Sequence, residues 1–234
     1  MLLKQRRRLP EIMDDPSLDS RRHLQALRGL ERINRLSRSL QIVYPPIKKL
    51  AIEIHPKPLR ILDIATGAGD LPIALLQQAH RDHLHLQADG CDLSPRAVDY
   101  ARTRAKEAKT EAGFFELDLF VNALPTDYDV VMASLFLHHI ENEQAVALLR
   151  RMGQAARRLV LMNDLVRSVR GLALAYLGTR LLSACDVVHQ DGPKSVQAAY
   201  TLDEVRSLSI QAGLEGAAIV HRWPCRFLLA WRRP

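Results

Sequence analysis

The stretch LRILDIATGAGDLP, residues 59–72, contains an apolar run, an aspartate, two glycines and a second apolar run. The first run predicts a buried strand ending near Asp63, and Gly67 and Gly69 predict a tight turn into a helix. Phosphate-binding loops present backbone N–H groups, and a carboxylate there would repel the ligand. Because Asp63 precedes the glycines, the turn suits a ligand that is cationic or rich in N–H and O–H donors.

Strands and helices alternate after this stretch. We predict strands at 59–64, 84–91, 113–117, 129–134 and 158–163, and helices near 70–80, 95–109, 141–156, 165–184 and 201–212. Repeated βα units indicate a mostly parallel sheet covered by helices on both faces. The last two strands, 215–222 and 225–232, are separated by only Trp223-Pro224, so we expect an antiparallel hairpin.

The chain before residue 59 follows a different pattern. We predict a mobile basic tail at 1–16, a helical lid at 17–58 and the α/β domain at 59–234. Apolar residues recur every three or four positions in the lid, which is typical of an amphipathic helix. Pro45-Pro46 should end that helix, and a second short helix should cover 47–54.

Composition narrows the class of protein. The net charge is +7, with basic clusters near both ends of the chain, but no basic stripe with interleaved aromatics indicates specific nucleic-acid binding. Weak association with an anionic membrane surface remains open. The three cysteines are too scattered for a disulfide framework or a zinc site, so we expect reduced thiols, no bound metal and a cytoplasmic location.

Polar side chains stand at the ends of several predicted strands. Asp63, Asp92, Asp118 and Ser134 occupy such ends, and open α/β sheets bind their ligands beyond the carboxyl ends of the strands. A carboxylate at Asp92 can accept both hydroxyls of a ribose, as in nucleotide sites of several kinds. Leu93 can cover one adenine face, and Asp118 can accept the adenine amino group. The alternatives are a helix cap at Asp92 and a turn at Asp118.

These features resemble class I S-adenosylmethionine-dependent methyltransferases from about residue 59 to the end of the chain. Residues 63–70, DIATGAGD, are similar to the family's Asp-x-Gly-x-Gly-x-Gly motif, with Ala65 at the first glycine. We expect that alanine to cost little if its φ is negative. The Ala-Thr-Gly-x-Gly-Asp form resembles the ubiquinone and menaquinone methyltransferase branch. The resemblance implies a Rossmann-like, doubly wound, seven-stranded sheet with an antiparallel last strand.

The resemblance also implies S-adenosylmethionine as the cofactor. Asp63 would then lie near the methionine ammonium, Asp92 would hold the ribose, and Asp118 would contact the adenine. The residues expected to contact the cofactor are Asp63, Ala65, Gly67, Gly69, Asp92, Leu93, Asp118, Leu119 and Ser134.

Four further residues are candidates for catalysis. His138 and His139 follow the fourth predicted strand, where many small-molecule members of the family carry Leu-His-His, and either imidazole can act as a general base. The alternative is that one orients the loop and the other faces solvent. Asp164 follows the fifth strand and is either an acceptor contact or a helix cap. His189 lies in a predicted polar loop at 185–195, which either touches the acceptor or forms a surface turn.

We therefore expect methyl transfer by in-line displacement to the oxygen or carbon of a small, apolar or aromatic acceptor. The alternatives are an RNA or protein methyltransferase and a non-catalytic protein that binds S-adenosylmethionine. An NAD-dependent oxidoreductase is disfavoured, because Pro72 stands where Gly-x-Gly-x-x-Gly needs its last glycine. The sequence leaves the oligomeric state open.

Overall fold

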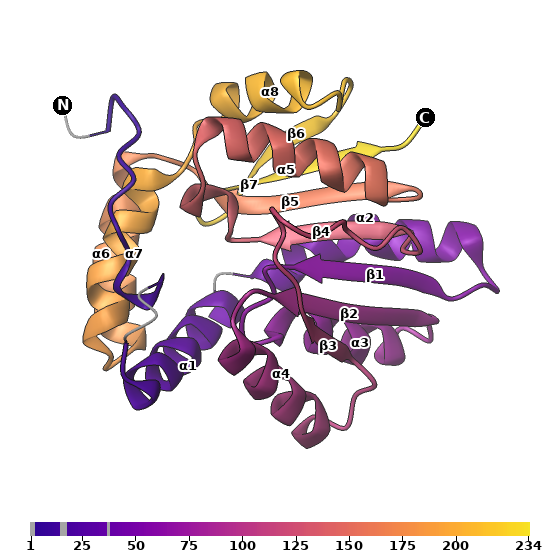
Figure 1. Cartoon of the computed structure of the whole chain (residues 1–234), viewed down its shortest axis with the longest axis horizontal. Helices are drawn as coiled ribbons and strands as arrows, with labels where there is room; N and C mark the ends of the chain where they lie inside the picture. Colours follow the sequence, from indigo (N-terminus) through magenta and orange to yellow (C-terminus); the bar gives the residue numbers. More distant parts are fainter. Residues whose placement is uncertain (1–2, 15–17, 37) are drawn as a thin grey trace.

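A computed structural model describes residues 3–14, 18–36 and 38–234. Its centre is a seven-stranded sheet in the order β3-β2-β1-β4-β5-β7-β6 (Figure 1). The strands are β1 Leu59–Ile64, β2 Leu86–Asp92, β3 Gly113–Glu116, β4 Val130–Ser134, β5 Leu159–Leu165, β6 Ala218–Arg222 and β7 Arg226–Arg232. β7 pairs antiparallel with both β5 and β6, and β1 to β5 pair in parallel. The predicted Rossmann-like sheet and its closing hairpin are confirmed.

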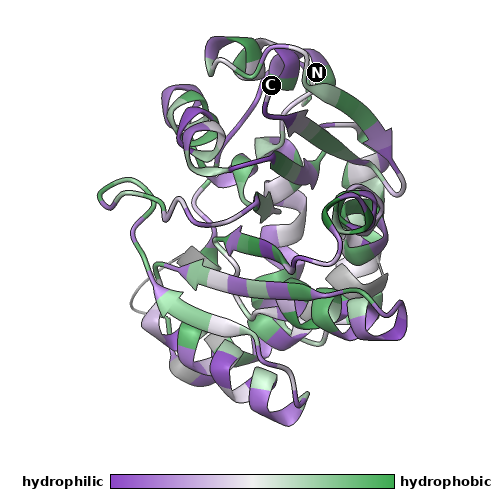
Figure 2. Cartoon of the chain, turned by 90° about the vertical axis from the view of Figure 1, so that its right-hand side faces the viewer, coloured by the Kyte–Doolittle hydropathy of each residue, from purple (hydrophilic) through white to green (hydrophobic). Residues whose placement is uncertain are grey.

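Helices cover both faces of this sheet. They are α1 Ser20–Leu36, α2 Ser39–Ile54, α3 Asp70–Arg81, α4 Pro95–Glu107, α5 Asn142–Ala155, α6 Val169–Leu182, α7 Asp186–Ala198 and α8 Leu202–Gln211, with 3-10 turns η1 Ile12–Asp14 and η2 Leu137–His139. One apolar core joins α5 and α8 to the sheet, and a second joins α2 and α3 to its other face. Figure 2 shows the sheet between these layers, seen from the side. Burial on both faces explains the nearly continuous apolar sequence of the central strands.

The order in which successive strands join the sheet reverses between β1 and β4, although both strands run in the same direction. β1 pairs with β2 on one side and with β4 on the other, so the connections diverge at these two neighbours. Such a switch point leaves space beyond the carboxyl ends of the strands, which is where doubly wound sheets hold their ligands. The fold therefore places the end of β1 at the centre of the candidate site.

The prediction that Pro45-Pro46 ends the first helix is wrong. Both prolines lie inside α2, and the break between α1 and α2 falls at Arg38, which has the left-handed φ of 61°. Each proline removes one intrahelical hydrogen bond. Burial of α2 side chains such as Val43 and Ile47 against the sheet compensates for that loss, which a single sequence does not reveal.

The prediction of a polar loop at 185–195 is also wrong, because most of that segment belongs to α7. Val187 and Val188 are buried against α1, and this apolar contact stabilises a helix that contains Pro193. Gly192 lets α7 approach α6 closely, since a Cβ there would lie 2.5 Å from the Cγ2 atom of Thr179. The sequence offers glycine and proline as turn signals, and helix packing overrides them.

Residues 3–14, which we call the N-terminal strap, lie with α6 and α7 beside the carboxyl edge of the sheet, at the left of Figure 1. Arg7 N–H donates to the Gln197 carbonyl at 3.0 Å, and the Arg6 guanidinium donates to the Ile140 carbonyl at 2.6 Å. The predicted tail at 1–16 thus makes ordered contacts along its described part, and its mobility stays a prediction. Residues 1–2 and 15–17, which belong to the predicted tail and lid, fall outside the described residues.

The lid predicted at 17–58 corresponds to α1 and α2, which differ in what they cover. α1 packs against α6 and α7, whereas α2 packs on the face of the sheet. α1 therefore lies near the carboxyl edge, and its role as a lid stays a prediction. In the part of the chain that the structure describes, no helix is long and apolar enough to cross a bilayer.

Candidate functional site

Asp63 is a buried carboxyl group at the end of β1, and it is only 2% exposed. The Thr66 hydroxyl donates to its Oδ2 atom at 2.8 Å, while its Oδ1 atom has no hydrogen-bond partner. Burial raises the pKa of Asp63 to about 8; the Thr66 hydrogen bond opposes this rise, and the charges of Asp70 and Asp92 add to it. A buried oxygen without a donor is costly, so this position suits a ligand that brings a donor or a positive charge.

The turn after β1 has an unusual backbone. Ala65, Gly67 and Gly69 have φ values of 52°, 56° and 69°. The condition under which Ala65 would cost little, a negative φ, is therefore not met, and the alanine occupies a left-handed conformation that glycine adopts without strain. At Gly69 a Cβ would also lie 2.6 Å from the Cζ atom of Phe114, so this turn has room only for glycine.

Asp92, at the end of β2, ties the first two strand ends together. Its Oδ2 atom accepts the Gly67 N–H at 2.8 Å, and its Oδ1 atom accepts the Ser94 N–H at 2.9 Å. The helix cap proposed as an alternative for Asp92 belongs to Ser94, whose hydroxyl accepts the Ala97 N–H. Leu93 beside it is 68% exposed, so its apolar face is open to a ligand.

Asp118 and Leu119 follow β3 and lie next to this pair of strand ends. The Leu117 N–H donates to the Asp92 carbonyl at 3.0 Å, which brings the β3 end against the β2 end. The Asp118 Oδ1 atom accepts the N–H groups of Phe120 and Val121, so the turn proposed as its alternative role is present. Leu119 is buried in the core. The cofactor roles of these two residues stay predictions.

On the other side of β1, Ser134 and Asn163 join the ends of β4 and β5. The Asn163 side-chain N–H donates to the Ser134 hydroxyl at 2.8 Å, and the Leu135 N–H donates to the Asn163 carbonyl at 2.8 Å. The Asn163 Oδ1 atom is buried without a partner, which makes it a second oxygen able to accept a donor from a ligand.

His138 and Asp164 form a buried pair, being 3% and 1% exposed. The His138 Nδ1 atom lies 2.7 Å from the Asp164 Oδ1 atom, and the His138 backbone N–H donates to Oδ2 at 3.0 Å. Burial alone would raise the pKa of Asp164, but the His138 charge and hydrogen bonds from His138 and Leu165 outweigh it, so this pKa is lowered. Asp164 is not the cap of α6, because Ser168 accepts the Gly171 N–H there.

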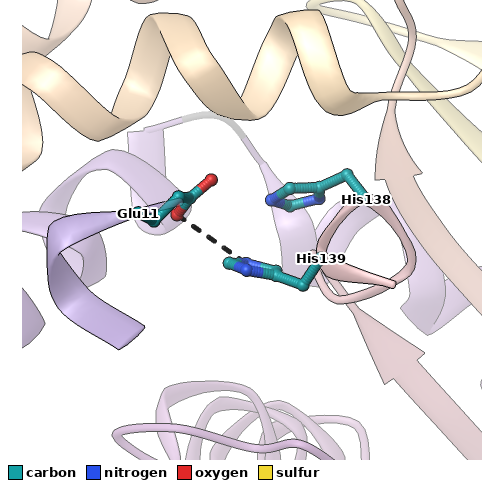
Figure 3. A group of neighbouring side chains, drawn as sticks. All are labelled: Glu11, His138 and His139. Atoms are coloured by element: carbon teal, nitrogen blue, oxygen red, sulfur yellow. Dashed lines mark ion pairs between the residues drawn. The ribbon is translucent and has the colours of Figure 1, made fainter. Parts of the chain in front are cut away.

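His139 and Glu11 lie beside this pair, as Figure 3 shows. The two histidine rings are 4.3 Å apart, and the His139 Nε2 atom is 3.9 Å from the Glu11 Oε2 atom. Glu11 belongs to the N-terminal strap, and its Oε1 atom accepts the Ser195 hydroxyl at 2.6 Å. Sequence reasoning missed Glu11, and no local signal marks it, because its neighbours at the site come from far along the chain.

His189 lies on α7, and the structure does not bring it into this group of side chains. Its Nε2 atom is 2.7 Å from the Ser183 carbonyl, so the ring bridges the connection between α6 and α7. On the same helix, Asp191 accepts the N–H groups of Ile12 and Met13 and thereby anchors the N-terminal strap. A catalytic role for His189 stays a prediction without geometric support.

Arg226 is a second residue that sequence reasoning missed. It opens β7, is 2% exposed, and donates to the Ser39 hydroxyl on α2. Burial lowers the pKa of Arg226 to about 10, while the charges of Asp164 and Asp70 oppose this change. Arg226 therefore brings positive charge near Asp164, at the end of β5, and Asp70, at the start of α3. An arginine at the first position of an otherwise apolar strand is the signal that could have found it.

Comparisons with known proteins agree with this geometry. Residues 61–158 match the family model described as a methyltransferase domain. A solved structure of the S-adenosylmethionine-dependent methyltransferase SibL superimposes with a TM-score of 0.68 at 20% identity, covering 94% of this chain and 60% of that one. The chain has a class I S-adenosylmethionine-dependent methyltransferase fold. The resemblance inferred from residues 63–70 is thereby confirmed.

Two further proteins are similar to this chain. Demethylmenaquinone methyltransferase from Thermus thermophilus is 33% identical over 116 residues, which cover 49% of this chain and 50% of that protein. The chain therefore spans about half the length of this curated relative. Magnesium protoporphyrin IX methyltransferase from Synechocystis PCC 6803, solved with bound SAH, superimposes with a TM-score of 0.58 at 18% identity over 95% of this chain and 91% of that one.

Proposed function

We propose that this methyltransferase uses S-adenosylmethionine to methylate the oxygen or carbon of a small, apolar or aromatic acceptor. The observation that carries the proposal is the buried Asp63 carboxyl at the switch point, with one oxygen lacking a donor. When bound, S-adenosylmethionine supplies a methyl group on a sulfonium sulfur, which leaves as a neutral thioether.

The residues at the ends of β1 to β3 fit this cofactor. The buried Asp63 oxygen can accept the methionine ammonium, and the positive charge would bring the raised pKa of Asp63 down. Asp92 is positioned by the N–H groups of Gly67 and Ser94, and carboxylate oxygens can accept further donors such as ribose hydroxyls. Exposed Leu93 is available to cover an adenine face.

The residues at the ends of β4 and β5 suit the acceptor side. The N-terminal strap and α7 cover η2, which carries His138, so an acceptor beside it would be shielded from water. An in-line displacement mainly requires that the acceptor atom, the methyl carbon and the sulfur are aligned and that water is excluded. The names of relatives support an aromatic acceptor, since one methylates demethylmenaquinone and another was solved with apigenin.

His138 supplies an imidazole held in a fixed orientation on this side. Asp164 accepts hydrogen bonds from both its ring and its backbone, which fixes the ring. With Nδ1 donating to Asp164, the Nε2 atom carries a lone pair. That lone pair can accept a proton from an acceptor hydroxyl or bind a cation.

Binding of S-adenosylmethionine to the purified protein, measured by calorimetry, tests the cofactor half of the proposal. We expect Asp92→Ala to weaken binding at least about 10-fold, because it removes a charged acceptor. Glu116→Gln, which alters an exposed carboxylate on β3, should leave the affinity unchanged. An Asp92→Ala variant that folds and binds as tightly as the natural protein would contradict the ribose contact.

Transfer of a labelled methyl group to a panel of phenols and hydroxylated quinones tests the acceptor half. Product with any of them supports the proposal. Transfer only to RNA, with a steep salt dependence, or only to protein would favour a macromolecular methyltransferase. Tight cofactor binding without transfer to any acceptor would favour a binding protein.

A weak membrane association and a cytoplasmic location remain part of the proposal. Support for the first comes from α6, whose large apolar side chains Leu174, Leu177 and Leu181 are at least half exposed. Arg170 and Arg180 are exposed on the same helix. An apolar helix face with nearby cations suits an anionic lipid surface, where apolar acceptors such as quinone precursors partition.

A further inference from the structure

We propose that Glu11, His138 and His139 form a binding site for one divalent transition-metal ion such as Zn²⁺, at the acceptor side of the methyltransferase domain. Binding of the ion is independent of the proposed function, and only its role toward the acceptor depends on it. Two imidazoles and one carboxylate are the ligand set of many catalytic zinc sites and of non-haem iron sites.

The three side chains converge from two separate parts of the chain. One ligand atom from each lies within 4.8 Å of the others. Figure 3 shows the two rings extending side by side from η2 toward the Glu11 carboxylate. The side chains of His138, His139 and Glu11 are 4%, 23% and 10% exposed, so little water competes for these positions.

Asp164 prepares His138 for this role. The carboxylate accepts from the ring at Nδ1, which leaves the Nε2 lone pair for the metal. Metal-binding histidines commonly donate their other ring N–H to a carboxylate, and this outer contact fixes the ring and raises its basicity. The His138–Asp164 pair is therefore an observation independent of the cluster itself, and it points to a ligand at Nε2.

Glu11 is also held in place. Ser195 on α7 donates to Oε1, and Asp191 on the same helix accepts the N–H groups of residues 12 and 13. The positive charges nearby already have partners. The Arg6 guanidinium is bound to the carbonyls of Ala198 and Ile140 and stacks on Tyr200, Arg8 pairs with Glu141, and Lys194 pairs with Asp191.

An ion held by three protein ligands keeps open positions. An acceptor hydroxyl or phenol bound there would lose its proton to water more readily, because the cation stabilises the oxygen anion. Methyl transfer then forms the O–CH₃ bond and breaks the S–CH₃ bond, with no protein base needed. This role and the base role of His138 exclude each other, since both use the single Nε2 lone pair.

Zinc binding to the full chain, prepared without a polyhistidine tag and stripped with a chelator, tests the proposal. We expect one Zn²⁺ per chain by competition with a chromophoric chelator, and a visible absorption band when Co²⁺ replaces it. Glu11→Gln, His138→Gln and His139→Gln should each weaken Zn²⁺ binding at least about 10-fold. His189→Gln and His221→Gln change histidines outside the cluster and should leave it unchanged.

Two results would overturn the metal site. One is no stoichiometric binding at micromolar Zn²⁺; the other is binding that the three cluster variants leave as tight as in the natural protein. Circular dichroism of each variant identifies any that fails to fold, and Co²⁺ absorption then decides among the remainder. Calorimetry with S-adenosylmethionine in the presence of chelator tests the proposed function separately, because the cofactor residues lie on other strands.

Discussion

The two halves of the carboxyl edge are assembled in different ways. The cofactor half comprises the ends of β1 to β3, where we propose that the cofactor binds, and the acceptor half comprises the ends of β4 and β5 with η2 and the N-terminal strap, where we propose that the acceptor binds. On the cofactor half, the deciding contacts join residues close in the chain: Thr66 to Asp63, three residues apart, and Gly67 to Asp92, 25 apart. On the acceptor half, Ser195 contacts Glu11 across 184 residues and Arg6 contacts the His138 carbonyl across 132. A local turn motif therefore specifies much of the first half. The second half joins contacts of moderate separation, such as His138 to Asp164, 26 residues apart, to contacts that only tertiary packing of the N-terminal strap creates.

The largest effect is expected on the acceptor half, at Asp164. Asp164→Asn removes the charge that fixes the His138 ring and leaves an amide N–H facing buried donors, so we expect turnover to fall about 100-fold or more. Steady-state kinetics with the accepted substrate measures this. Asp186→Asn, on the exposed start of α7, is the matched control and should retain full turnover. Equal activity of both variants would show that the acceptor half does not depend on this pair.

The next effect is expected on the cofactor half, at Asp63. Asp63→Asn preserves shape but removes the charge, so S-adenosylmethionine affinity should fall about 10- to 100-fold, the range for losing a charged hydrogen bond. Calorimetry gives the affinity, and zinc binding by the same variant should stay unchanged. A parallel loss of both would mean that the two halves are not independent.

The raised pKa of Asp63 also predicts a pH dependence of stability. In the unfolded chain the Asp63 carboxyl has its ordinary pKa of 3.8, whereas burial raises the pKa of the folded group to about 8. The folded state therefore binds more protons in between, and the free energy of unfolding contributed by this group falls as pH rises from 4 to 8, by up to about 1.4 kcal/mol per pH unit. We expect the free energy of unfolding, measured in urea at several pH values, to fall less steeply with pH in Asp63→Asn than in the natural protein.

A smaller effect is expected from Ala65→Gly. At a φ of 52° the alanine is strained, so glycine should stabilise the protein by about 0.5–1 kcal/mol despite its greater freedom in the unfolded chain. Thermal unfolding measures the change. Ala68→Gly in the same turn is the control, because Ala68 is not among the residues with positive φ. Glycine there relieves no strain, so we expect this variant to be less stable than the natural protein.

The smallest effect concerns the exposed face of α6. Leu177→Glu should reduce co-sedimentation with anionic phospholipid vesicles a few-fold, since it places a negative charge on the apolar face. Ile210→Glu, at an exposed apolar position on α8, should have no such effect. Equal binding of both variants would remove α6 as the membrane contact.

How much the sequence predicts differs between the halves for a physical reason. Hydrophobic periodicity and the Gly67–Gly69 turn predicted the strands and the position of Asp63, because these depend on neighbouring residues. The arrangement of the strands in a seven-stranded sheet was implied by the resemblance to a known family. The helical state of Pro45-Pro46 and of 186–198 depends on burial against distant partners. The proline and glycine residues there therefore predicted a helix end and a loop that the structure does not contain. Glu11 and Arg226 were not predicted, because only the folded chain brings them to the site.

The docking of the N-terminal strap has a practical consequence for anyone producing this protein. A fusion partner or affinity tag attached ahead of residue 3 would lie on the side of the molecule where we propose that the acceptor binds. The other end of the chain emerges across the sheet, at the right of Figure 1, where the Arg233 N–H meets the Arg158 carbonyl. Surface immobilisation through that end would keep the entrance facing bulk solution.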